Sequence, residues 1–364
     1  MTMRVLNVLH QGGGAGSVTS TLHLSLGLQR AGVAVRFACP PHSEVEALAR
    51  AGGLEVHPLD LRPGERRANA AALAELIARH PVELINSQSA RDRQALTWLA
   101  LRGALPAPLV LTRRQMPRTF VLENWLSSRA AARVVAVSGA VAGALRRRGT
   151  PARKLVVIPN GLVTERVDVP VDPTGVERWR ERIGWTPEQR TIGIVARPKD
   201  QAVVLAALAR VRTPVRLVLA GVEPAGTLGA LAREVPRPHA AVCVPFSADI
   251  RPLYELLELV LLPSRGEGLS QSLLEAMALA KPVIASAAAG NLDLVTPEAD
   301  GLLVPPLDPA AWASAIERLL ADPDLSLRLG GAARHTAREK FALEHTIQRT
   351  LGLYRALALG PRPR

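Results

Sequence analysis

Short runs of β-branched and other apolar residues alternate with stretches rich in Ala and Leu along most of this 364-residue chain. Such alternation is typical of α/β proteins, in which helices connect the strands of a parallel sheet. The apolar runs predict strands at Arg4–Leu9, Ala34–Cys39, Leu84–Ser87, Leu109–Leu111, Val134–Val137, Val156–Ile158, Thr191–Val195, Arg216–Ala220, Ala241–Val244, Leu259–Leu262 and Pro282–Ser286. We therefore expect an α/β fold with doubly wound parallel sheets.

The chain is long for one hydrophobic core, and the strand pattern restarts after a segment rich in charge and proline. We expect a Rossmann-like domain at 1–165, a linker at 166–190 and a second Rossmann-like domain at 191–343. Residues 344–364 are predicted to form a helix, whose apolar face comprises Ile347, Leu351, Tyr354 and Ala358. Because parallel sheets bind ligands outside the carboxyl ends of their strands, the expected active site is a cleft that the two domains face.

The formal charge is +13, and Lys contributes only four of the basic side chains. Such a surplus favours anionic partners, although an Arg-rich and Ala-rich coding style would produce part of the same bias. Nucleic acid is not expected as a partner, because aromatic residues make up only 3% of the chain and no zinc-finger or aromatic RNA-binding pattern occurs. Phosphorylated substrates and an anionic membrane surface fit the charge better.

The location expected from the sequence is the cytoplasm. The N-terminus lacks the basic start and long apolar core of a signal peptide, and no apolar stretch reaches the roughly 18–20 residues that a membrane span requires. The two cysteines, Cys39 and Cys243, are far apart and imply no disulfide framework.

Two carboxylates, Glu267 and Glu275, flank a loop-to-helix junction in an otherwise apolar segment. Apart from Glu275, every residue from Leu273 to Ala280 is apolar, which predicts a buried helix in which the carboxylate needs a partner. Ser270 is a suitable N-cap, and the glycines before it, including Gly268, let the backbone approach a ligand. The helix start would attract phosphate while the carboxylates accept hydrogen bonds from hydroxyl groups, which favours a sugar nucleotide. The alternative is a buried helix with one Glu in a structural salt bridge.

The segment His10–Ser17 is glycine-rich and follows the first predicted strand. Gly12 and Gly14 match the start of a dinucleotide-binding motif, but Ser17 replaces the third glycine and the second strand ends without an acidic residue. An NAD dehydrogenase is therefore disfavoured. We expect a loop whose backbone amides meet substrate or phosphate, with a plain tight turn as the alternative.

Arg197 and Lys199 follow the first strand of the second domain. At the carboxyl end of that strand they would neutralise a diphosphate, the Arg as a fork and the Lys as a point charge. A solvated loop is the alternative.

Polar segments also follow two strands of the first domain, at 86–92 and 111–118. Together with His10 they provide the expected acceptor-side residues, which are His10, Ser87, Arg91, Arg113 and Arg114. No metal site is expected, because the histidines lack metal-ligand spacing and the pair Asp322 and Asp324 flanks a proline that favours a turn. No nucleophile elbow or Walker loop occurs.

Taken together, these segments resemble the GT-B fold glycosyltransferases of family 4, the group 1 nucleotide-sugar transferases. The resemblance covers nearly the whole chain. The segments that match best are Leu262–Ser270, Leu274–Met277, Lys281–Ser286, Asp300–Pro306 and Val157–Gly161.

The resemblance implies a donor site in the second domain. Glu275 would bind the donor ribose, Glu267 would contact the donor sugar, and Arg197 with Lys199 would stabilise the diphosphate leaving group, so that Glu267, Arg197 and Lys199 are the expected catalytic residues. The remaining implied donor-binding residues are Gly268, Leu269, Ser270, Val244, Phe246, Gly14 and Gly16. The last helix of such proteins packs back on the N-terminal domain.

Some positions depart from the family pattern. The arginine–lysine loop is shorter than usual, Leu269 stands where Phe is common, and Arg113–Arg114 replaces a segment that often holds a His.

The resemblance implies a metal-independent, retaining transfer of a sugar from a nucleoside-diphosphate sugar to a hydroxyl acceptor, without a cofactor. The expected acceptor is a cell-envelope glycan or glycolipid, and a lipid-linked acceptor would suit peripheral binding to an anionic membrane. Arg113, Arg114 and Arg118 beside Phe120 and Trp125 favour such binding, unless the apolar side chains pack inside the domain. The alternatives are an epimerase or hydrolase of nucleotide sugars that uses His10 as acid or base, and a non-catalytic nucleotide-sugar-binding scaffold.

Overall fold

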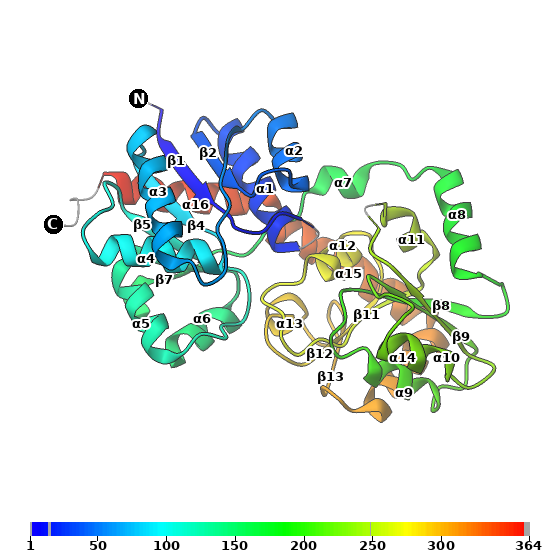
Figure 1. Cartoon of the computed structure of the whole chain (residues 1–364). Coiled ribbons are helices and arrows are strands. Elements are labelled where there is room, and N and C mark those ends of the chain that lie inside the picture. Colours follow the sequence, from blue (N-terminus) through cyan, green and yellow to red (C-terminus); the bar gives the residue numbers. More distant parts are fainter. Residues whose placement is uncertain (1, 14–15, 248, 360–364) are drawn as a thin grey trace. The chain divides into compact units, whose positions relative to one another are not determined.

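The computed structural model describes residues 2–13, 16–247 and 249–359, which form two compact α/β units (Figure 1). Unit 1 comprises Met1–Gly161 and Leu343–Arg364, and unit 2 comprises Leu162–Ala342. Each unit contains one parallel sheet, so the predicted α/β fold with two doubly wound domains is confirmed.

Unit 1 contains a seven-stranded sheet in the order β3-β2-β1-β4-β5-β6-β7, with every neighbouring pair parallel. Its strands are β1 (Arg4–Val8), β2 (Ala34–Cys39), β3 (Glu55–Pro58), β4 (Leu84–Ser87), β5 (Leu109–Arg113), β6 (Arg133–Ala136) and β7 (Leu155–Val157). Val5 of β1 is in register with Val35 of β2 and with Leu84 of β4. The chain therefore changes direction across the sheet between β1 and β4, the position at which doubly wound sheets bind ligands.

Helices connect the strands of unit 1. They are α1 (Gly16–Arg30), α2 (Glu44–Ala51), α3 (Arg66–Arg79), α4 (Ala90–Leu101), α5 (Val121–Ala130), α6 (Gly139–Arg147), the 3₁₀ helix η1 (Ala152–Lys154) and the C-terminal α16 (Leu343–Ala358).

The C-terminal helix α16 packs against α1 within unit 1. Gly27 allows this close approach, because a Cβ atom there would lie 2.2 Å from Cδ1 of Ile347. Ile347, Leu351 and Tyr354 of the predicted packing face are buried, whereas Ala358 at the end of the helix is exposed.

Unit 2 contains a six-stranded parallel sheet in the order β10-β9-β8-β11-β12-β13. Its strands are β8 (Arg190–Val195), β9 (Val215–Ala220), β10 (Ala240–Val244), β11 (Leu259–Leu262), β12 (Val283–Ser286) and β13 (Leu302–Val304). Its helices are α7 (Thr164–Asp168), α8 (Pro173–Ile183), α9 (Ala202–Leu208), α10 (Thr227–Arg233), α11 (Arg251–Leu256), α12 (Gln271–Ala278), α13 (Asn291–Leu294), α14 (Pro309–Ala321) and α15 (Pro323–Phe341). In this sheet the order in which the chain adds strands reverses between β8 and β11.

The segment 166–190, expected as a linker, is largely helical and belongs to unit 2. Asp172 caps α8, Pro173 occupies its first turn, and Gly184 ends it in the left-handed conformation with φ 61°. Trp179 is buried and donates from Nε1 to the carbonyl oxygen of Asp249 at 3.0 Å. Charge and proline at these positions therefore belong to a capped, packed helix and not to an open connection.

The predicted strands agree with the observed ones to within one or two residues at each end. Two short strands, β3 and β13, were not predicted. Among the described residues, the helices all lack the length and apolarity needed to cross a membrane.

Candidate functional site

The loops after β8 and β11 meet at the direction change of the unit 2 sheet. The Lys199 ammonium forms an ion pair with Oε1 of Glu267, so the structure brings together two of the residues expected to be catalytic. In the same two loops, Arg265 donates two hydrogen bonds to the carboxylate of Asp200. One comes from its backbone nitrogen and one from NH2, and each is 3.0 Å long. These two ion pairs tie residues far apart in sequence into one polar site at the carboxyl ends of the strands.

Asp200 keeps its charge in this site. Burial is the largest influence and raises the pKa of Asp200, but the hydrogen bonds from Arg265 and the positive charges of Arg265 and Lys199 together lower it below its ordinary value. Gln201 fixes the same loop, because its Nε2 donates to the carbonyl oxygen of Arg197 at 2.7 Å. The Arg197 side chain is exposed, and Lys199 is also accessible. Both cations therefore lie on one hydrogen-bonded loop, and Lys199 contacts Glu267.

Ser270 caps the start of α12, as predicted, since its Oγ accepts from the backbone nitrogen of Leu273 at 3.3 Å. Leu269 and Ser270 are each 6% exposed, and Gly268 is buried as well. A ligand would therefore meet the backbone of this turn more than its side chains. The first amide groups of α12 point along the helix toward that turn and favour negative charge there.

Glu275 is half-buried on α12 and lies beside the buried phenol of Tyr254. Burial raises the pKa of Tyr254 well above its ordinary value, and the charge and hydrogen bonding of Glu275 raise it further. Tyr254 therefore remains a neutral hydroxyl, and it donates to the carbonyl oxygen of Ser272 at 3.1 Å. This contact holds the first turn of α12, and the predicted ribose-binding residue, Glu275, follows in the same helix.

The loop after β12 packs against the loop that contains Glu267. The sequence analysis did not single out this loop. A Cβ atom on Gly290 would lie 1.9 Å from the carbonyl oxygen of Gly268, and the backbone nitrogen of Gly290 donates to the carbonyl oxygen of Glu267 at 3.0 Å. Asn291 is buried, and its Nδ2 donates to the carbonyl oxygens of Ser264 at 3.1 Å and Ser286 at 3.0 Å. The position of Glu267 therefore depends on a glycine and an amide 23 or 24 residues away in the chain.

The residues expected near the nucleobase differ in exposure. Val244 is 2% exposed at the end of β10, whereas Phe246 is 60% exposed in the loop that follows. Only Phe246 offers a side-chain surface to a ligand. Of the two glycines of unit 1 that were expected to bind the donor, Gly16 begins α1, and Gly14 lies outside the described residues.

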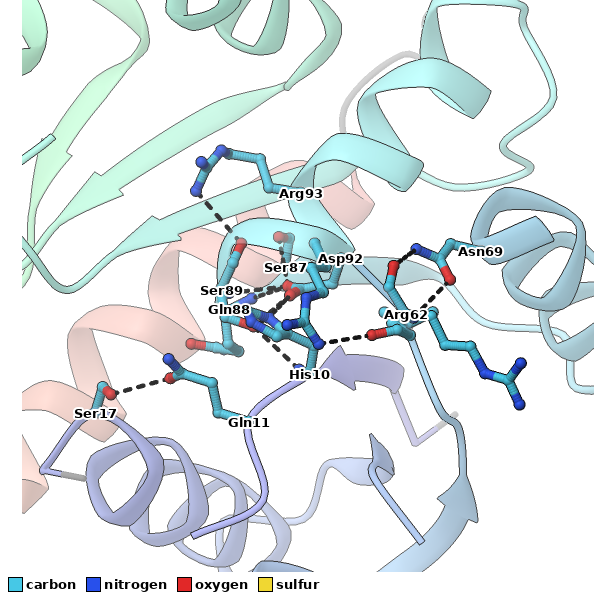
Figure 2. Close-up of polar contacts among 12 residues, drawn as sticks. His10, Gln11, Ser17, Arg62, Asn69, Ser87, Gln88, Ser89, Asp92 and Arg93 are labelled. Atoms are coloured by element: carbon cyan, nitrogen blue, oxygen red, sulfur yellow. Dashed lines mark hydrogen bonds and ion pairs between the residues drawn. The ribbon is translucent and has the colours of Figure 1, made fainter. Parts of the chain in front are cut away.

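In unit 1, the loops after β1 and β4 form a second polar site, shown in Figure 2. The Nδ1 atom of His10 lies 2.5 Å from Oγ of Ser89 and 3.1 Å from Oδ1 of Asp92. Asp92 also accepts from Oγ of Ser87 at 2.7 Å and from the backbone nitrogens of Gln88 at 2.8 Å and Ser89 at 2.9 Å. Ser89 and Asp92 together form a capping box at the start of α4. The structure thus joins two predicted acceptor-side residues, His10 and Ser87, through an aspartate that the sequence analysis did not select.

Asp92 is fully buried and ionised. Burial is the largest influence and raises its pKa, but hydrogen bonds from His10, Ser89 and Ser87, with the charge of His10, bring the pKa below its ordinary value. An ionised carboxylate facing Nδ1 requires a proton on that nitrogen, so a neutral His10 ring has its lone pair on Nε2. The His10 side chain is 11% exposed, which leaves a route for a ligand hydroxyl. This arrangement is able to accept a proton or a hydrogen bond.

The other predicted acceptor-side residues have different surroundings. Arg91 is half-buried, and its NH1 donates to the carbonyl oxygen of Leu61 at 2.9 Å. Arg113 and Arg114 are only 6% and 8% exposed. Arg113 donates to Oδ1 of Asn124 at 2.9 Å, and Arg114 donates to Asn160 and, at 3.0 Å, to Oε1 of Gln88.

Burial lowers the pKa of Arg113 to about 9, with repulsion from Arg93 adding to the effect, and lowers that of Arg114 to about 10. Both groups therefore stay charged at neutral pH inside unit 1, where Arg113 contacts α5 and Arg114 contacts the loops after β4 and β7. An acceptor contact for either residue remains a prediction.

One group of three described residues could hold a metal ion, namely Glu55, His57 and His80. It lies on the edge strand β3 and at the end of α3, and the Glu55 carboxylate already binds Nε of Arg36 at 3.0 Å. Asp322, considered above as a metal ligand, instead caps α15 and accepts from the backbone nitrogen of Leu325 at 2.9 Å.

Two family descriptions match successive parts of the chain. Residues 14–166 match Glycosyltransferase Family 4, and residues 189–322 match Glycosyl transferases group 1. The chain belongs to the family 4 glycosyltransferases. The resemblance inferred from the motifs is therefore confirmed, and the two matches fall on the first and second parts of the family 4 chain.

Curated relatives support this assignment over part of their length. The putative glycosyltransferase EpsD of Bacillus subtilis is 31% identical over 220 residues, which cover 58% of this chain and 56% of that protein. A D-inositol 3-phosphate glycosyltransferase of Xylanimonas cellulosilytica is 31% identical over 241 residues, or 61% of this chain and 58% of that protein. This family 4 chain thus spans little more than half of the length of these relatives.

Solved structures show the same fold. The crystal structure of HepE from Anabaena in complex with UDP-glucose has a TM-score of 0.84 and 20% identity, and the match covers 98% of this chain and 100% of that one. The two parallel sheets are therefore those of a GT-B glycosyltransferase.

Proposed function

We propose that this protein transfers a sugar from a nucleoside-diphosphate sugar to a hydroxyl acceptor. The observation that carries the proposal is the meeting of Lys199 with Glu267 at the direction change of the unit 2 sheet, next to the capped start of α12. Such a site offers cations and helix amide groups to a diphosphate and carboxylates to sugar hydroxyls. The family assignment supports the same reaction class.

In this proposal the departure of the diphosphate is the hard step. Lys199 and Arg197 stabilise the developing negative charge from a loop that Asp200 and Gln201 hold in place, so little reorganisation accompanies the reaction. Glu275 binds the donor ribose and Glu267 contacts the reacting sugar. Retention of configuration and independence of metal are proposed from the family resemblance. UDP-glucose is the first donor to test, because HepE was crystallised with it.

The acceptor is proposed to be a cell-envelope glycan or glycolipid reached at an anionic membrane. Phe120, Val121, Leu122 and Trp125 are 82%, 57%, 66% and 42% exposed, so these side chains do not pack inside unit 1. Arg118 next to them is also exposed, whereas Arg113 and Arg114 are buried and do not belong to this surface. Exposed apolar side chains beside cations suit the interface of an anionic bilayer.

The experiment is a transfer assay with UDP-, GDP- and ADP-glucose in the presence of a metal chelator. We expect one donor to release its nucleotide, and faster when an acceptor extract from cell envelopes is present, with the α-linked product of retention seen by proton NMR. Release that requires added magnesium or manganese would refute metal independence. A β-linked product would refute retention. Failure of all donors with every acceptor fraction would refute the transferase proposal.

A further inference from the structure

A pocket of about 210 Å³ opens on unit 1 where α3 and α4 begin. Three arginines line it, Arg62, Arg66 and Arg91, and no Asp or Glu is among the described lining residues. Asn69 lines it as well, and Figure 2 shows Asn69 and Arg62 near Asp92 in the first turn of α4. The pocket is therefore positively charged and lies within one unit.

Three side-chain hydrogen bonds connect the backbone at the edge of this pocket to α3 and α4. Asn69 is 6% exposed; its Oδ1 accepts from the backbone nitrogen of Arg62 at 3.0 Å, and its Nδ2 donates to the carbonyl oxygen of the same residue at 2.8 Å. Arg91 ties α4 to this loop through its bond to the carbonyl oxygen of Leu61 at 2.9 Å. A buried amide thus fixes the loop while the arginines remain at its surface.

The charges of the three guanidinium groups are only partly compensated. Nε of Arg62 lies 3.2 Å from Oδ2 of Asp60, and its NH1 lies 4.0 Å from Oε1 of Glu65. Arg91 has its backbone carbonyl partner, and Arg66 is exposed with no hydrogen bond or ion pair to its side chain among the described residues. Two cations that face one open space repel each other unless an anion separates them. A phosphate group has a charge of about −1.5 to −2 and three acceptor oxygens, which matches this set of forked donors.

The pocket and the His10 site both involve residues at the start of α4. Arg91 lies between Ser89 and Asp92, the two residues that contact Nδ1 of His10. A phosphate held by Arg66 and Arg91 would therefore lie at the same end of α4 that contacts the histidine. The first turns of α3 and α4 add a smaller attraction for negative charge.

We propose that this pocket binds a phosphate group on the sugar acceptor. The proposal rests on the proposed function and narrows the acceptor to a phosphate-bearing hydroxyl compound. The same chemistry occurs in a soluble sugar phosphate and in a lipid headgroup, so the experiment separates the two sources.

The experiment is isothermal titration of the full chain with glucose 6-phosphate, inorganic phosphate, glucuronate and glucose, compared with sedimentation of phosphatidylcholine vesicles with and without phosphatidic acid. The test variant is Arg66→Ala with Arg91→Ala. The matched control is Arg67→Ala, because Arg67 is the exposed neighbour of Arg66 on α3 and does not line the pocket. Circular dichroism checks that each variant is folded, and Arg91→Lys retains the charge if the double variant is unstable.

We expect the phosphate compounds to bind the native chain and glucose not to bind. The double variant should weaken phosphate binding by about tenfold or more, the effect of losing a charged hydrogen bond, while Arg67→Ala changes it less than about twofold. Arg66-dependent binding of soluble phosphates supports a soluble acceptor, and Arg66-dependent binding to phosphatidic acid alone supports a lipid one. Equal binding by the two variants, binding of neither phosphate source, or equally tight glucuronate binding would overturn the proposal.

Titration of the same variants with UDP-glucose separates this proposal from the proposed function. UDP-glucose binding should be unchanged in the double variant, since unit 2 contains the proposed donor site. If the chain binds phosphate through Arg66 but turns over no nucleotide sugar, the transferase proposal is contradicted. Phosphate binding by the pocket would still be supported.

Discussion

His10 Nδ1 lies 3.1 Å from Oδ1 of Asp92, a carboxylate with no solvent exposure. The contact joins the loop after β1 to the first turn of α4, so it serves the fold of unit 1 as well as the orientation of the imidazole (Figure 2). A buried charge is stable only when its hydrogen bonds are complete, and Asp92 obtains them from Ser87, Gln88, Ser89 and His10. The histidine is therefore one member of a network that folding requires.

Replacing Asp92 by Asn should destabilise the protein by about 2–4 kcal/mol at neutral pH, because charge-assisted hydrogen bonds are lost in a buried site. The pKa of Asp92 is lowered from 3.8, so its contribution is complete well above that ordinary value and is lost as the pH falls from it through the lower, folded-state value. Urea unfolding at pH 7 and pH 3.5 measures this. The difference in the free energy of unfolding between the native chain and Asp92→Asn should be smaller at pH 3.5 than at pH 7. Glu75→Gln, in an exposed pair with Arg79, should cost less than about 1 kcal/mol. A gap that does not depend on pH would show that Asp92 is not ionised.

Removing Lys199 should affect catalysis much more than stability. Lys199→Ala should lower the turnover of the nucleotide-sugar donor by about 100-fold or more, the scale of a lost electrostatic contact to a transition state. Its side chain is 39% exposed, so the free energy of unfolding should change by less than about 1 kcal/mol. Nucleotide release and urea unfolding are the two measurements, and Lys340→Ala on α15 is the control. Unchanged turnover in Lys199→Ala would exclude the cation from the leaving-group site.

A single methyl group at Gly290 should disturb the loop that contains Glu267. Gly290 has φ −67°, which Ala adopts readily, so the effect comes only from the contact of its Cβ with the carbonyl oxygen of Gly268 at 1.9 Å. We expect Gly290→Ala to cost about 1–3 kcal/mol and to weaken donor binding. Gly331→Ala in α15 meets nothing within 4 Å and should stabilise by about 0.4–1 kcal/mol. Equal stability of the two variants in urea would contradict the packing described here.

Phe120→Ser with Leu122→Ser should reduce sedimentation with anionic vesicles at low salt, because these residues form the exposed apolar surface beside Arg118. Binding of the native chain should fall as salt screens the charges. Leu327→Ser is the control, since Leu327 is 77% exposed on α15 of unit 2. A native chain that stays in the supernatant, or equal loss in the control, would contradict the membrane proposal.

Much of the fold could be predicted because most of its strands are mainly apolar. The buried parallel strand Leu259–Leu262 shows as a short apolar run, and its predicted bounds match the observed ones. The edge strand β3 was not predicted because three of its four residues are polar or proline and it is partly exposed. The segment expected as a linker contained the signals of a helix, Asp172 before Pro173 and Gly184 after the last turn, which charge and proline content outweighed.

The candidate site could be predicted only in part. Motif and N-cap patterns located Glu267, Lys199 and Ser270, and the spacing of Ser89 and Asp92 is that of a capping box that would have revealed the aspartate. Support from Gly290 and Asn291 depends on contacts between distant loops, which no local pattern encodes. The burial of Arg113 and Arg114 was also hidden, because a charged pair after a strand normally indicates a solvated loop.

Nucleotide binding by the Glu275 site tests the central claim most directly. Chemical unfolding of the native chain with UDP, GDP, ADP and CMP should show that one nucleotide stabilises it, by about 2.7 kcal/mol at 100 times the dissociation constant. Glu275→Ala should weaken that binding by roughly 2–4 kcal/mol, whereas Glu255→Ala, an exposed carboxylate on α11, should leave it unchanged. Stabilisation by none of the four nucleotides, or equal stabilisation of Glu275→Ala and the native chain, would contradict the assignment of unit 2 as the donor-binding unit.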